Sequence, residues 1–294
     1  MGSIQLHDHG LEGRPDDPDQ RQPAAPVLCG GPMSTPDPLP VRTDWFAIED
    51  ADDNGVRRVR ETHVHEYGGG SMWLVEGSEK ALLVETGVGV APLRQFLETV
   101  TSKPIMAFAS LGYYDHAGGL HQFDERLIHA NDAHRIRQPN RYNTAAEWYF
   151  QGAFDAAPWE GFSLDDYVMP ASEPTRLLAD GDVIDLDDRQ FRVHHLPGVT
   201  TGACALFEEA TGVLFAGETL VWDGDYVYDG EVEERTDDAD RPAFRDSMTR
   251  LLALPATAVY PGHFGRGDLG AMRHAIEGYL AGNSVRHGEN TYAT

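Results

Sequence analysis

Short apolar runs alternate with turns and helical patterns along most of this chain, and this alternation limits the folds open to it. Residues 81–84 and 105–109 have the composition of buried strands, with apolar side chains at helical spacing between them. The charged segment 76–80 predicts a hairpin between two short strands. Further strands are expected at 45–48, 56–64, 71–75, 183–186, 191–195, 203–207, 213–215 and 258–260, and helices at 93–100, 241–254 and 269–280. The pattern predicts an α/β fold of two mixed sheets covered by helices.

Two segments depart from this alternation. Residues 1–42 are rich in Pro, Gly, Asp and Gln and predict a disordered or loosely packed N-terminal arm, followed by one domain over 43–294. Residues 140–175 crowd many aromatic side chains into a stretch of weak periodicity and read as an insertion. Such an insertion can line a substrate pocket or form a homodimer contact, or it can pack a small core of its own, and the sequence leaves these alternatives open.

The strongly acidic composition narrows the classes of partner. The 294 residues carry a formal net charge of -25, and Lys80 and Lys103 are the only lysines. Such a surface repels nucleic acid and anionic membranes, so a small-molecule substrate is expected instead. The composition favours adaptation to a salt-rich habitat, although a high-GC genome also enriches Asp and Arg. Cys29 and Cys204 make no disulfide framework, and we expect a cytoplasmic protein because neither a signal peptide nor a membrane span is evident.

The loop at residues 110–119 reads Ser-Leu-Gly-Tyr-Tyr-Asp-His-Ala-Gly-Gly and directly follows a predicted buried strand. It resembles T-H-x-H-x-D-H-x-G-G, the metal-binding loop of the metallo-β-lactamase superfamily. Leu111 and Tyr113 stand where that pattern has two histidines, whereas Asp115 and His116 match it. Polar loops at strand ends are common ligand sites in α/β proteins, so the position suits this interpretation.

Four further stretches are similar to motifs of the same superfamily, in the same order. Residues 81–87 resemble L-L-v-D-T-G, with Glu85 in place of Asp, and residues 195–202 resemble H-T-P-G-H-T-P-G, with Val199 in place of a histidine. Residues 214–219 and 260–263 resemble L-F-x-G-D-T and the closing P-G-H. Together the motifs cover about residues 45–282, and the resemblance implies an αββα sandwich of two mixed sheets flanked by helices.

The resemblance also divides the expected metal site into two unequal halves. One metal of the family is held by three histidines, and the matching positions here are Leu111, Tyr113 and Val199, none of which can replace an imidazole. The other half retains metal-competent side chains at all its positions, which are Asp115, His116, Glu218 and His263. Two imidazoles and two carboxylates suit a single zinc or iron ion with an open position for water.

The expected function is therefore a mononuclear metal hydrolase, in which a metal-activated water attacks an ester, lactone, thioester, lactam or aryl halide. Asp115 and Tyr113 are the candidate catalytic residues, the latter as a hydrogen-bond donor to a developing oxyanion. Candidate substrate contacts are Leu111, Tyr114, Val199, Trp148 and His65. Two alternatives stay open: a metal-free member of the fold that binds a ligand or protein partner, and a metal-independent enzyme.

Overall fold

The computed structural model describes residues 39–150, 152–219 and 240–282, all of which belong to the second of two units that divide after Pro38. The predicted arm therefore lies outside the described residues, except for its last four. Within those four, Val41 forms a parallel bridge with Ala157, and the Arg42 N–H donates a hydrogen bond to the Ala157 carbonyl (3.0 Å). The ordered pairing of the domain thus starts slightly before residue 43.

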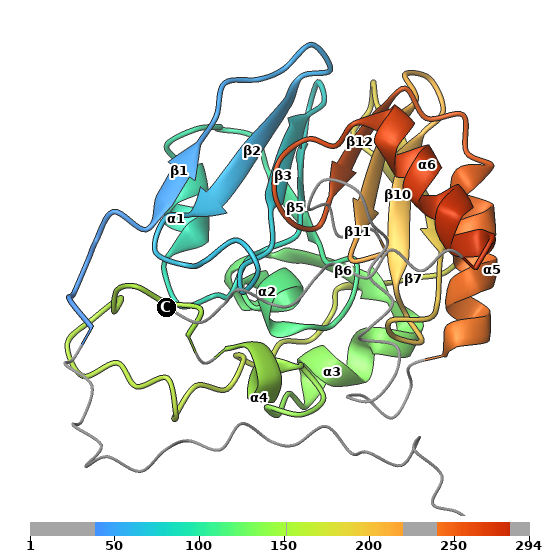
Figure 1. The fold of residues 1–294 in the computed structure, drawn as a ribbon. Coiled ribbons are helices and arrows are strands. Elements are labelled where there is room, and N and C mark those ends of the chain that lie inside the picture. The colour runs from blue at the N-terminus through green and yellow to red at the C-terminus, as the bar shows by residue number, and fades with distance from the viewer. Residues whose placement is uncertain (1–38, 151, 220–239, 283–294) are drawn as a thin grey trace, which may run out of the picture. The chain divides into compact units, whose positions relative to one another are not determined.

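A seven-stranded sheet forms the first layer of the domain (Figure 1). The strands follow one another in sequence order, antiparallel from β1 to β4 and parallel from β4 to β7. They are β1 (Phe46–Ile48), β2 (Val56–Glu61), β3 (Met72–Glu76), β4 (Ala81–Val84), β5 (Ile105–Phe108), β6 (Glu125–His129) and β7 (Arg176–Leu178).

A five-stranded sheet forms the second layer, in the order β12-β11-β10-β9-β8. Its pairs are antiparallel except for β11 with β12, which is parallel. The strands are β8 (Val183–Asp185), β9 (Gln190–His195), β10 (Cys204–Glu208), β11 (Val213–Gly217) and β12 (Ala258–Pro261). Both sheets are mixed, as the sequence predicts.

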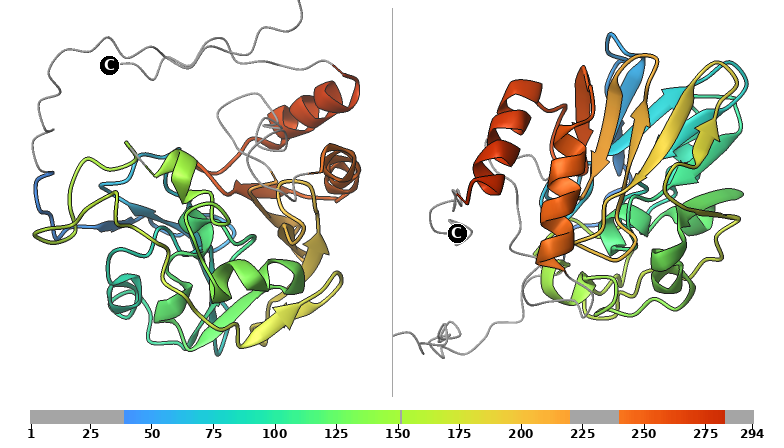
Figure 2. Two further views of the ribbon diagram at one scale, coloured as in Figure 1. Left: turned by 90° about the horizontal axis from the view of Figure 1, so that it is seen from below. Right: turned by 90° about the vertical axis from the view of Figure 1, so that its right-hand side faces the viewer.

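Helices cover the outer face of each sheet, which Figure 2 shows most clearly for the second one. Apolar side chains of β10, β11 and β12 pack with those of α5 and α6, and a separate cluster fills the space between the sheets. Asp240 and Asp268 begin α5 and α6 by accepting hydrogen bonds from the N–H groups of Ala243 (3.0 Å) and Ala271 (2.8 Å). The helices are α1 (Leu93–Leu97), α2 (Tyr114–Ala117), α3 (Ala133–Arg137), α4 (Ala146–Tyr149), α5 (Arg241–Leu252) and α6 (Leu269–Leu280), with 3-10 turns at Leu120–Gln122 and Ala130–Asp132. The predicted αββα sandwich is confirmed.

The aromatic-rich segment packs onto the main core of the first sheet. Phe150 and Tyr167 stack with ring centroids 3.8 Å apart, and Tyr114 meets Phe150 edge-on at 5.5 Å. These rings belong to the same buried cluster as the outer face of the first sheet. Tyr142 and Trp159 remain exposed, at 64% and 50% of their surface. In the part of the chain that the structure covers, no helix is long and apolar enough to cross a membrane.

Candidate metal centre

Asp115 and His116 lie on α2, which follows the loop at the end of β5. The carboxylate of Glu85 fixes this loop by accepting a hydrogen bond from the Ser110 N–H (3.1 Å). Thr86 donates to the carbonyl of His116 through both its N–H (2.8 Å) and its hydroxyl (2.9 Å). The segment that ends β4 therefore sets the position of both candidate ligands.

Four buried side chains from three distant parts of the sequence converge at this point. Oε2 of Glu218, which follows β11, lies 3.1 Å from His116 Nε2 and 3.0 Å from His263 Nε2. Oδ2 of Asp115 lies 3.5 Å and 3.3 Å from the same two nitrogens. The structure thus brings together all four side chains that the sequence predicts as ligands.

Two glycines allow the loops around this cluster to approach closely. A Cβ atom on Gly262 would lie 2.9 Å from Cε1 of His116, and one on Gly70 would lie 2.7 Å from the carbonyl oxygen of Asp115. Real Cβ atoms do not come this near to other heavy atoms without displacement. Gly70 and Gly262 are therefore needed at these positions for steric reasons.

Both imidazoles are oriented from the side opposite the cluster. Nδ1 of His116 lies 3.3 Å from Oε2 of Glu85, and Nδ1 of His263 donates a hydrogen bond to the carbonyl of Glu66 (2.9 Å). An oxygen acceptor at one ring nitrogen is the usual support of a histidine whose other nitrogen binds metal. The two Nε2 atoms are accordingly the ones that point into the cluster.

The charges of the cluster shift its titrations in opposite directions. Burial alone would lower the pKa of both histidines, but the carboxylates outweigh it, chiefly Asp115 at His116 and Glu218 at His263, and raise each pKa well above its ordinary value. Burial would likewise raise the pKa of Glu218, but the two histidines lower it to about 2. The cluster therefore favours an ionised Glu218, which attracts positive charge.

Asp115, His116 and His263 form a group that could hold a metal ion, and Glu218 lies beside both histidines. Four ligands bound at 2.0–2.1 Å around a tetrahedral zinc would lie about 3.3 Å from one another. The separations between the histidine nitrogens and the carboxylate oxygens are close to this value, at 3.0 Å to 3.5 Å. His116 Nε2 and Glu218 Oε2 are buried and make no aligned hydrogen bond although they are close, which is the state expected of atoms arranged to share a cation.

The other half of the family's site is apolar and filled. Leu111, Tyr113 and Val199 are 0%, 4% and 2% exposed and belong to one core cluster with residues of α5 and α6. The side chains that replace the three histidines therefore pack against the helices of the second sheet. Trp148 is partly buried and packs against the same cluster.

Asp132, which is fully buried, connects the two loops that carry these apolar side chains. Its Oδ2 accepts hydrogen bonds from the Gly112 N–H (2.8 Å) and the Thr200 hydroxyl (2.8 Å). Oδ1 lies 3.6 Å from Nε of Arg135, whose guanidinium lies over the ring of Tyr113 at 5.7 Å. The buried Asp132–Arg135 ion pair thus lies between α3 and the apolar half.

The remaining predicted substrate contacts are Tyr114 and His65. Tyr114 is 1% exposed, and its hydroxyl donates a hydrogen bond to the carbonyl of Gly68 (2.7 Å), so in this structure it supports the loop after β2. The side chain of His65 is exposed, and its ring stacks on that of Tyr67 with the ring centroids 5.9 Å apart. Substrate contact by these residues stays a prediction.

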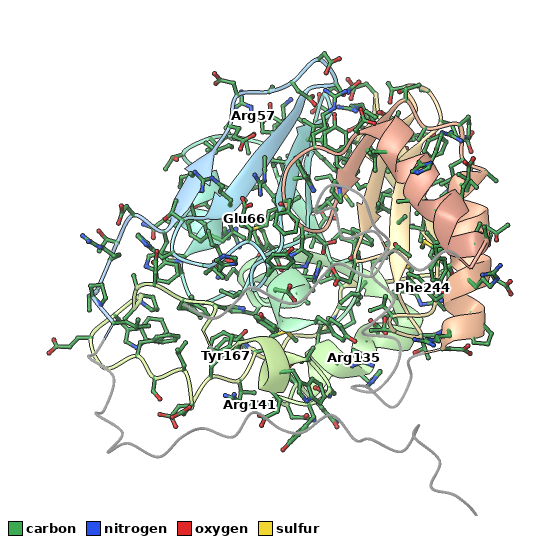
Figure 3. All side chains as sticks on the ribbon, in the orientation of Figure 1. Arg57, Glu66, Arg135, Arg141, Tyr167 and Phe244 are labelled. Carbon is green, nitrogen blue, oxygen red and sulfur yellow. The ribbon has the colours of Figure 1, made fainter. Side chains whose placement is uncertain are left out.

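Sequence reasoning missed three supporting residues, namely Glu66, Asp132 and Arg135. Figure 3 labels Glu66 in the loop after β2 and Arg135 on α3. Glu66 acts through its backbone carbonyl, which any residue could supply, and so left no signal in the sequence. Asp132 and Arg135 are three residues apart, a spacing that predicts neighbouring side chains once a helix is known, but α3 is too short to be recognised from its pattern.

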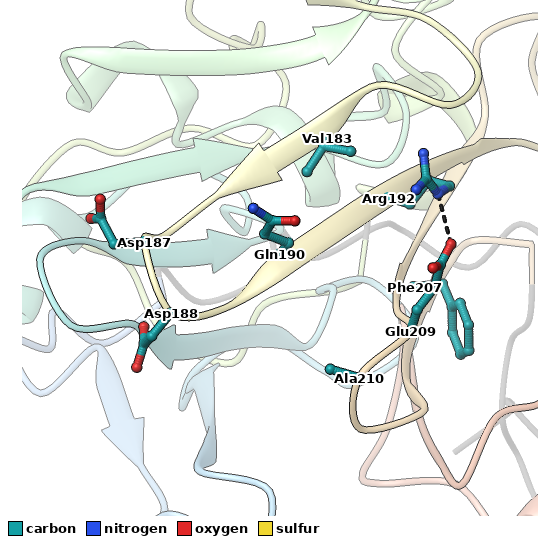
Figure 4. Close-up of a pocket in the computed structure, with 8 residues that line it drawn as sticks. All are labelled: Val183, Asp187, Asp188, Gln190, Arg192, Phe207, Glu209 and Ala210. Carbon is teal, nitrogen blue, oxygen red and sulfur yellow. Dashed lines mark hydrogen bonds and ion pairs between the residues drawn. The ribbon is translucent and has the colours of Figure 1, made fainter.

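A hollow of about 450 Å³ lies on the second sheet, and none of the predicted site residues lines it (Figure 4). Its walls come from the β8–β9 and β10–β11 hairpins and include an Arg192–Glu209 ion pair at 2.8 Å. The hollow and the histidine cluster therefore have no lining residue in common.

Comparisons with known proteins agree with this architecture. Solved structures of similar fold include a metallo-beta-lactamase from Pontibacter korlensis, with a TM-score of 0.57, 18% identity, and coverage of 81% of this chain and 99% of that one. A metallo-beta-lactamase family protein from Thermus thermophilus has a TM-score of 0.53 and 22% identity, over 72% of this chain and 74% of that one. At these identities the likeness concerns the fold alone.

Comparison of sequences identifies relatives and a family as well as a fold. Curated relatives named "Acyl-coenzyme A thioesterase MBLAC2" from Homo sapiens and Bos taurus are each 27% identical over 266 residues, covering 85% of this chain and 92% of the relative. Residues 114–263, which contain all four converging side chains, match the family described as the metallo-beta-lactamase superfamily. The predicted resemblance is thereby confirmed, and the chain belongs to the metallo-beta-lactamase superfamily.

Proposed function

We propose that this protein is a metal-dependent thioester hydrolase that uses one zinc or iron ion held by Asp115, His116, Glu218 and His263. The observation that carries the proposal is the convergence of two Nε2 atoms and two carboxylates at 3.0–3.5 Å. Nδ1 of His263 donates a hydrogen bond to the carbonyl of Glu66, and Nδ1 of His116 lies 3.3 Å from Oε2 of Glu85 without an aligned hydrogen bond. An oxygen beside the second ring nitrogen is the ordinary support of a metal-binding histidine.

The thioester is selected from the five substrate classes because of the relatives. The name of these relatives gives acyl-coenzyme A as their substrate, and they align with this chain over 85% of its length. In thioester hydrolysis, water adds to the carbonyl carbon, the carbon–sulfur bond breaks, and a carboxylic acid and a thiol leave. The substrate is a small molecule, in keeping with an acidic chain that disfavours nucleic acid.

Some of the protein's groups would hold the ion, and others would shape the site around it. A bound ion supplies Lewis acidity and lowers the pKa of a water molecule toward 7. Glu85 and the Glu66 carbonyl orient the two imidazoles, and Asp115 is placed to accept a proton at Oδ2. The buried cluster of Leu111, Tyr113 and Val199 excludes a second ion and water from the other half.

A metal-free binding protein is the second candidate, and the titration of the cluster favours it. Because the pKa values of His116 and His263 are raised, two imidazolium ions could balance the two carboxylates without a metal. The protein would then act by binding a ligand or a protein partner. The two candidates differ in metal content and in turnover.

Elemental analysis of the purified protein, combined with a thioesterase assay, separates these candidates. We expect about one zinc or iron per chain, and hydrolysis of an acyl-coenzyme A that a chelator abolishes. In His263→Ala both metal and activity should be lost, whereas His274→Ala, an exposed histidine on α6, should retain both. Full activity with chelator, or no metal after reconstitution, would refute the proposed mechanism.

A further inference from the structure

Three aromatic rings lie in a row beside the candidate ligand His263. The ring of Phe264 meets that of Tyr67 edge-on at 4.7 Å, and Tyr67 stacks on His65 at 5.9 Å with an angle of 9° between the planes. Phe264 itself lies 6.4 Å from the ring of His263. His65 is exposed and the other two rings are half-buried, so we call His65, Tyr67 and Phe264 the rim rings.

The backbone holds the first two rim rings in a fixed position relative to His263. The carbonyl of Glu66, between these rings in sequence, accepts the hydrogen bond from His263 Nδ1 (2.9 Å). The N–H groups of Gly68 and Gly69 both donate to the carbonyl of His65, at 2.8 Å and 2.9 Å. The loop is thus a closed turn attached to the metal-binding cluster, and a ligand would meet rings that are already arranged.

Phe264 adopts a backbone conformation that an aromatic residue rarely adopts. Its φ is 62°, in the left-handed region that favours glycine, and this conformation is strained for a residue other than glycine. The conformation is maintained by Ser71, whose hydroxyl donates to the Phe264 carbonyl and whose N–H donates to the carbonyl of Gly262 (2.6 Å). A glycine would fit this backbone without strain, so the presence of a ring calls for a function.

The charged groups near the rim rings already have partners. Arg58 contacts the carboxylates of Glu66 (2.9 Å) and Glu49 (3.7 Å). Arg266, two residues after Phe264, pairs with Asp52 (3.1 Å) and Asp53 (2.6 Å). A phosphate-bearing group would have to compete with these carboxylates, whereas an uncharged planar group would not.

We propose that the rim rings form the subsite for the acyl group of the substrate and favour a planar aromatic acyl group. The assignment rests on the proposed thioester hydrolysis for the identity of the ligand. Rings that adjoin a ligand of the ion reach the groups bonded to the carbonyl carbon. Of these, the thiol arm of an acyl-coenzyme A is aliphatic, so a planar aromatic group there can only be the acyl group. Aromatic rings bind another ring edge-on or offset more favourably than their contact area alone predicts.

The test compares benzoyl and cyclohexanecarbonyl thioesters of one thiol, which have the same ring size but differ in planarity. Wild type should prefer the benzoyl substrate in kcat/KM by about fivefold, mainly through KM. Tyr67→Leu and Phe264→Gly should both lose this preference. Trp159→Leu, which removes an exposed ring of the aromatic-rich segment, should keep it.

Phe264→Gly is included because it should fold. Glycine relieves the strained φ, so this variant should unfold at the same temperature as wild type or higher. Binding of benzoate against cyclohexanecarboxylate by calorimetry gives a second readout, independent of turnover. If no thioester is hydrolysed but benzoate still binds more tightly, and Phe264→Gly removes the difference, the proposed function fails and the aromatic subsite stands. Hydrolysis with no preference for the planar ring in either readout would overturn the subsite and leave the hydrolase intact.

Discussion

The two halves of the family's metal site have taken opposite forms in this chain. In one half, the Nε2 atoms of His116 and His263 each lie within 3.5 Å of carboxylate oxygens of Asp115 and Glu218. In the other half, the three positions expected to hold histidines are filled by side chains that are at most 4% exposed. The two loops of the apolar half are connected by Asp132, which accepts a hydrogen bond from each.

This contrast teaches that two parts of one site can be held together by different forces, packing in one half and charge in the other. The apolar half contributes packing and a buried hydrogen-bonded carboxylate, and these stabilise the fold without a metal. The polar half keeps four ionisable groups buried, which is unfavourable unless a cation or protons compensate them. Stability and metal binding should therefore depend on different halves, and substitutions can separate the two properties.

The largest effect on stability is expected for Asp132→Ala. The substitution leaves the Gly112 N–H and the Thr200 hydroxyl without their acceptor and leaves Arg135 buried without its carboxylate. Breaking a buried pair in this way destabilises a protein by about 3–5 kcal/mol. Urea denaturation measures the loss, and metal content at low temperature should stay at the wild-type level. Asp124→Ala, which removes an exposed partner of Arg94, should change the stability little; equal effects of the two variants would contradict the role of Asp132.

Leu111→Ala should also destabilise the apolar half without affecting the metal. Leu111 is fully buried in the cluster with α5 and α6, so truncation removes apolar contacts and leaves a cavity. Such substitutions cost about 2–5 kcal/mol. The measurement is the free energy of unfolding together with the metal content. Loss of metal in a variant that is still folded would show that the two halves are coupled, contrary to the comparison.

Much of the fold was predictable because its strands and longer helices carry strong periodic patterns. The strand at residues 81–84 and the helix at 269–280 match the structure at both ends. Strand β6 (Glu125–His129) was missed because charged residues flank its apolar centre, and its pairing with β5 is a tertiary effect. The short helices α2, α3 and α4, of four or five residues, are too short for a periodic pattern.

The site was predictable only where a motif marks it. The four converging side chains lie in recognisable motifs, so their number and order were visible in the sequence. Asp132 lies in no such motif and meets partners 20 and 68 residues away, which only the fold brings together. Tyr114 illustrates the reverse problem, because its place inside the motif says nothing of the direction in which its ring points, which is into the core.

On the polar side, Glu85→Gln should weaken metal binding without abolishing it. Gln keeps an acceptor for the Ser110 N–H but removes the negative charge 3.3 Å from His116 Nδ1. Changes to such supporting groups reduce metal affinity by about 10–100-fold. Competition with a coloured chelator measures the affinity, with the exposed Glu98→Gln as the control. Unchanged affinity in Glu85→Gln would mean that Glu85 supports only the loop.

The last prediction concerns Glu61→Gln and the dependence of stability on pH. Glu61 is buried at the end of β2, where its Oε2 accepts a hydrogen bond from the Val88 N–H (3.0 Å). Burial raises the pKa of Glu61 from 4.5 to about 8, the charge of Asp115 adds to this, and the Val88 N–H opposes it. The folded protein therefore holds this proton between about pH 4.5 and pH 8, while the unfolded chain has released it.

Because the folded state binds the extra proton, this group's contribution to stability is fully present below about pH 4.5 and decreases as the pH rises toward 8. The slope is at most about 1.4 kcal/mol per pH unit for a single group. Glutamine does not titrate, so Glu61→Gln does not lose stability through this group as the pH rises. Its free energy of unfolding relative to wild type should therefore rise between pH 5 and pH 8, as measured by urea denaturation at several pH values. The exposed Glu76→Gln should show no such trend. A difference between Glu61→Gln and wild type that does not change with pH would mean that Glu61 is ionised in the fold, and that a further buried negative charge acts on Asp115.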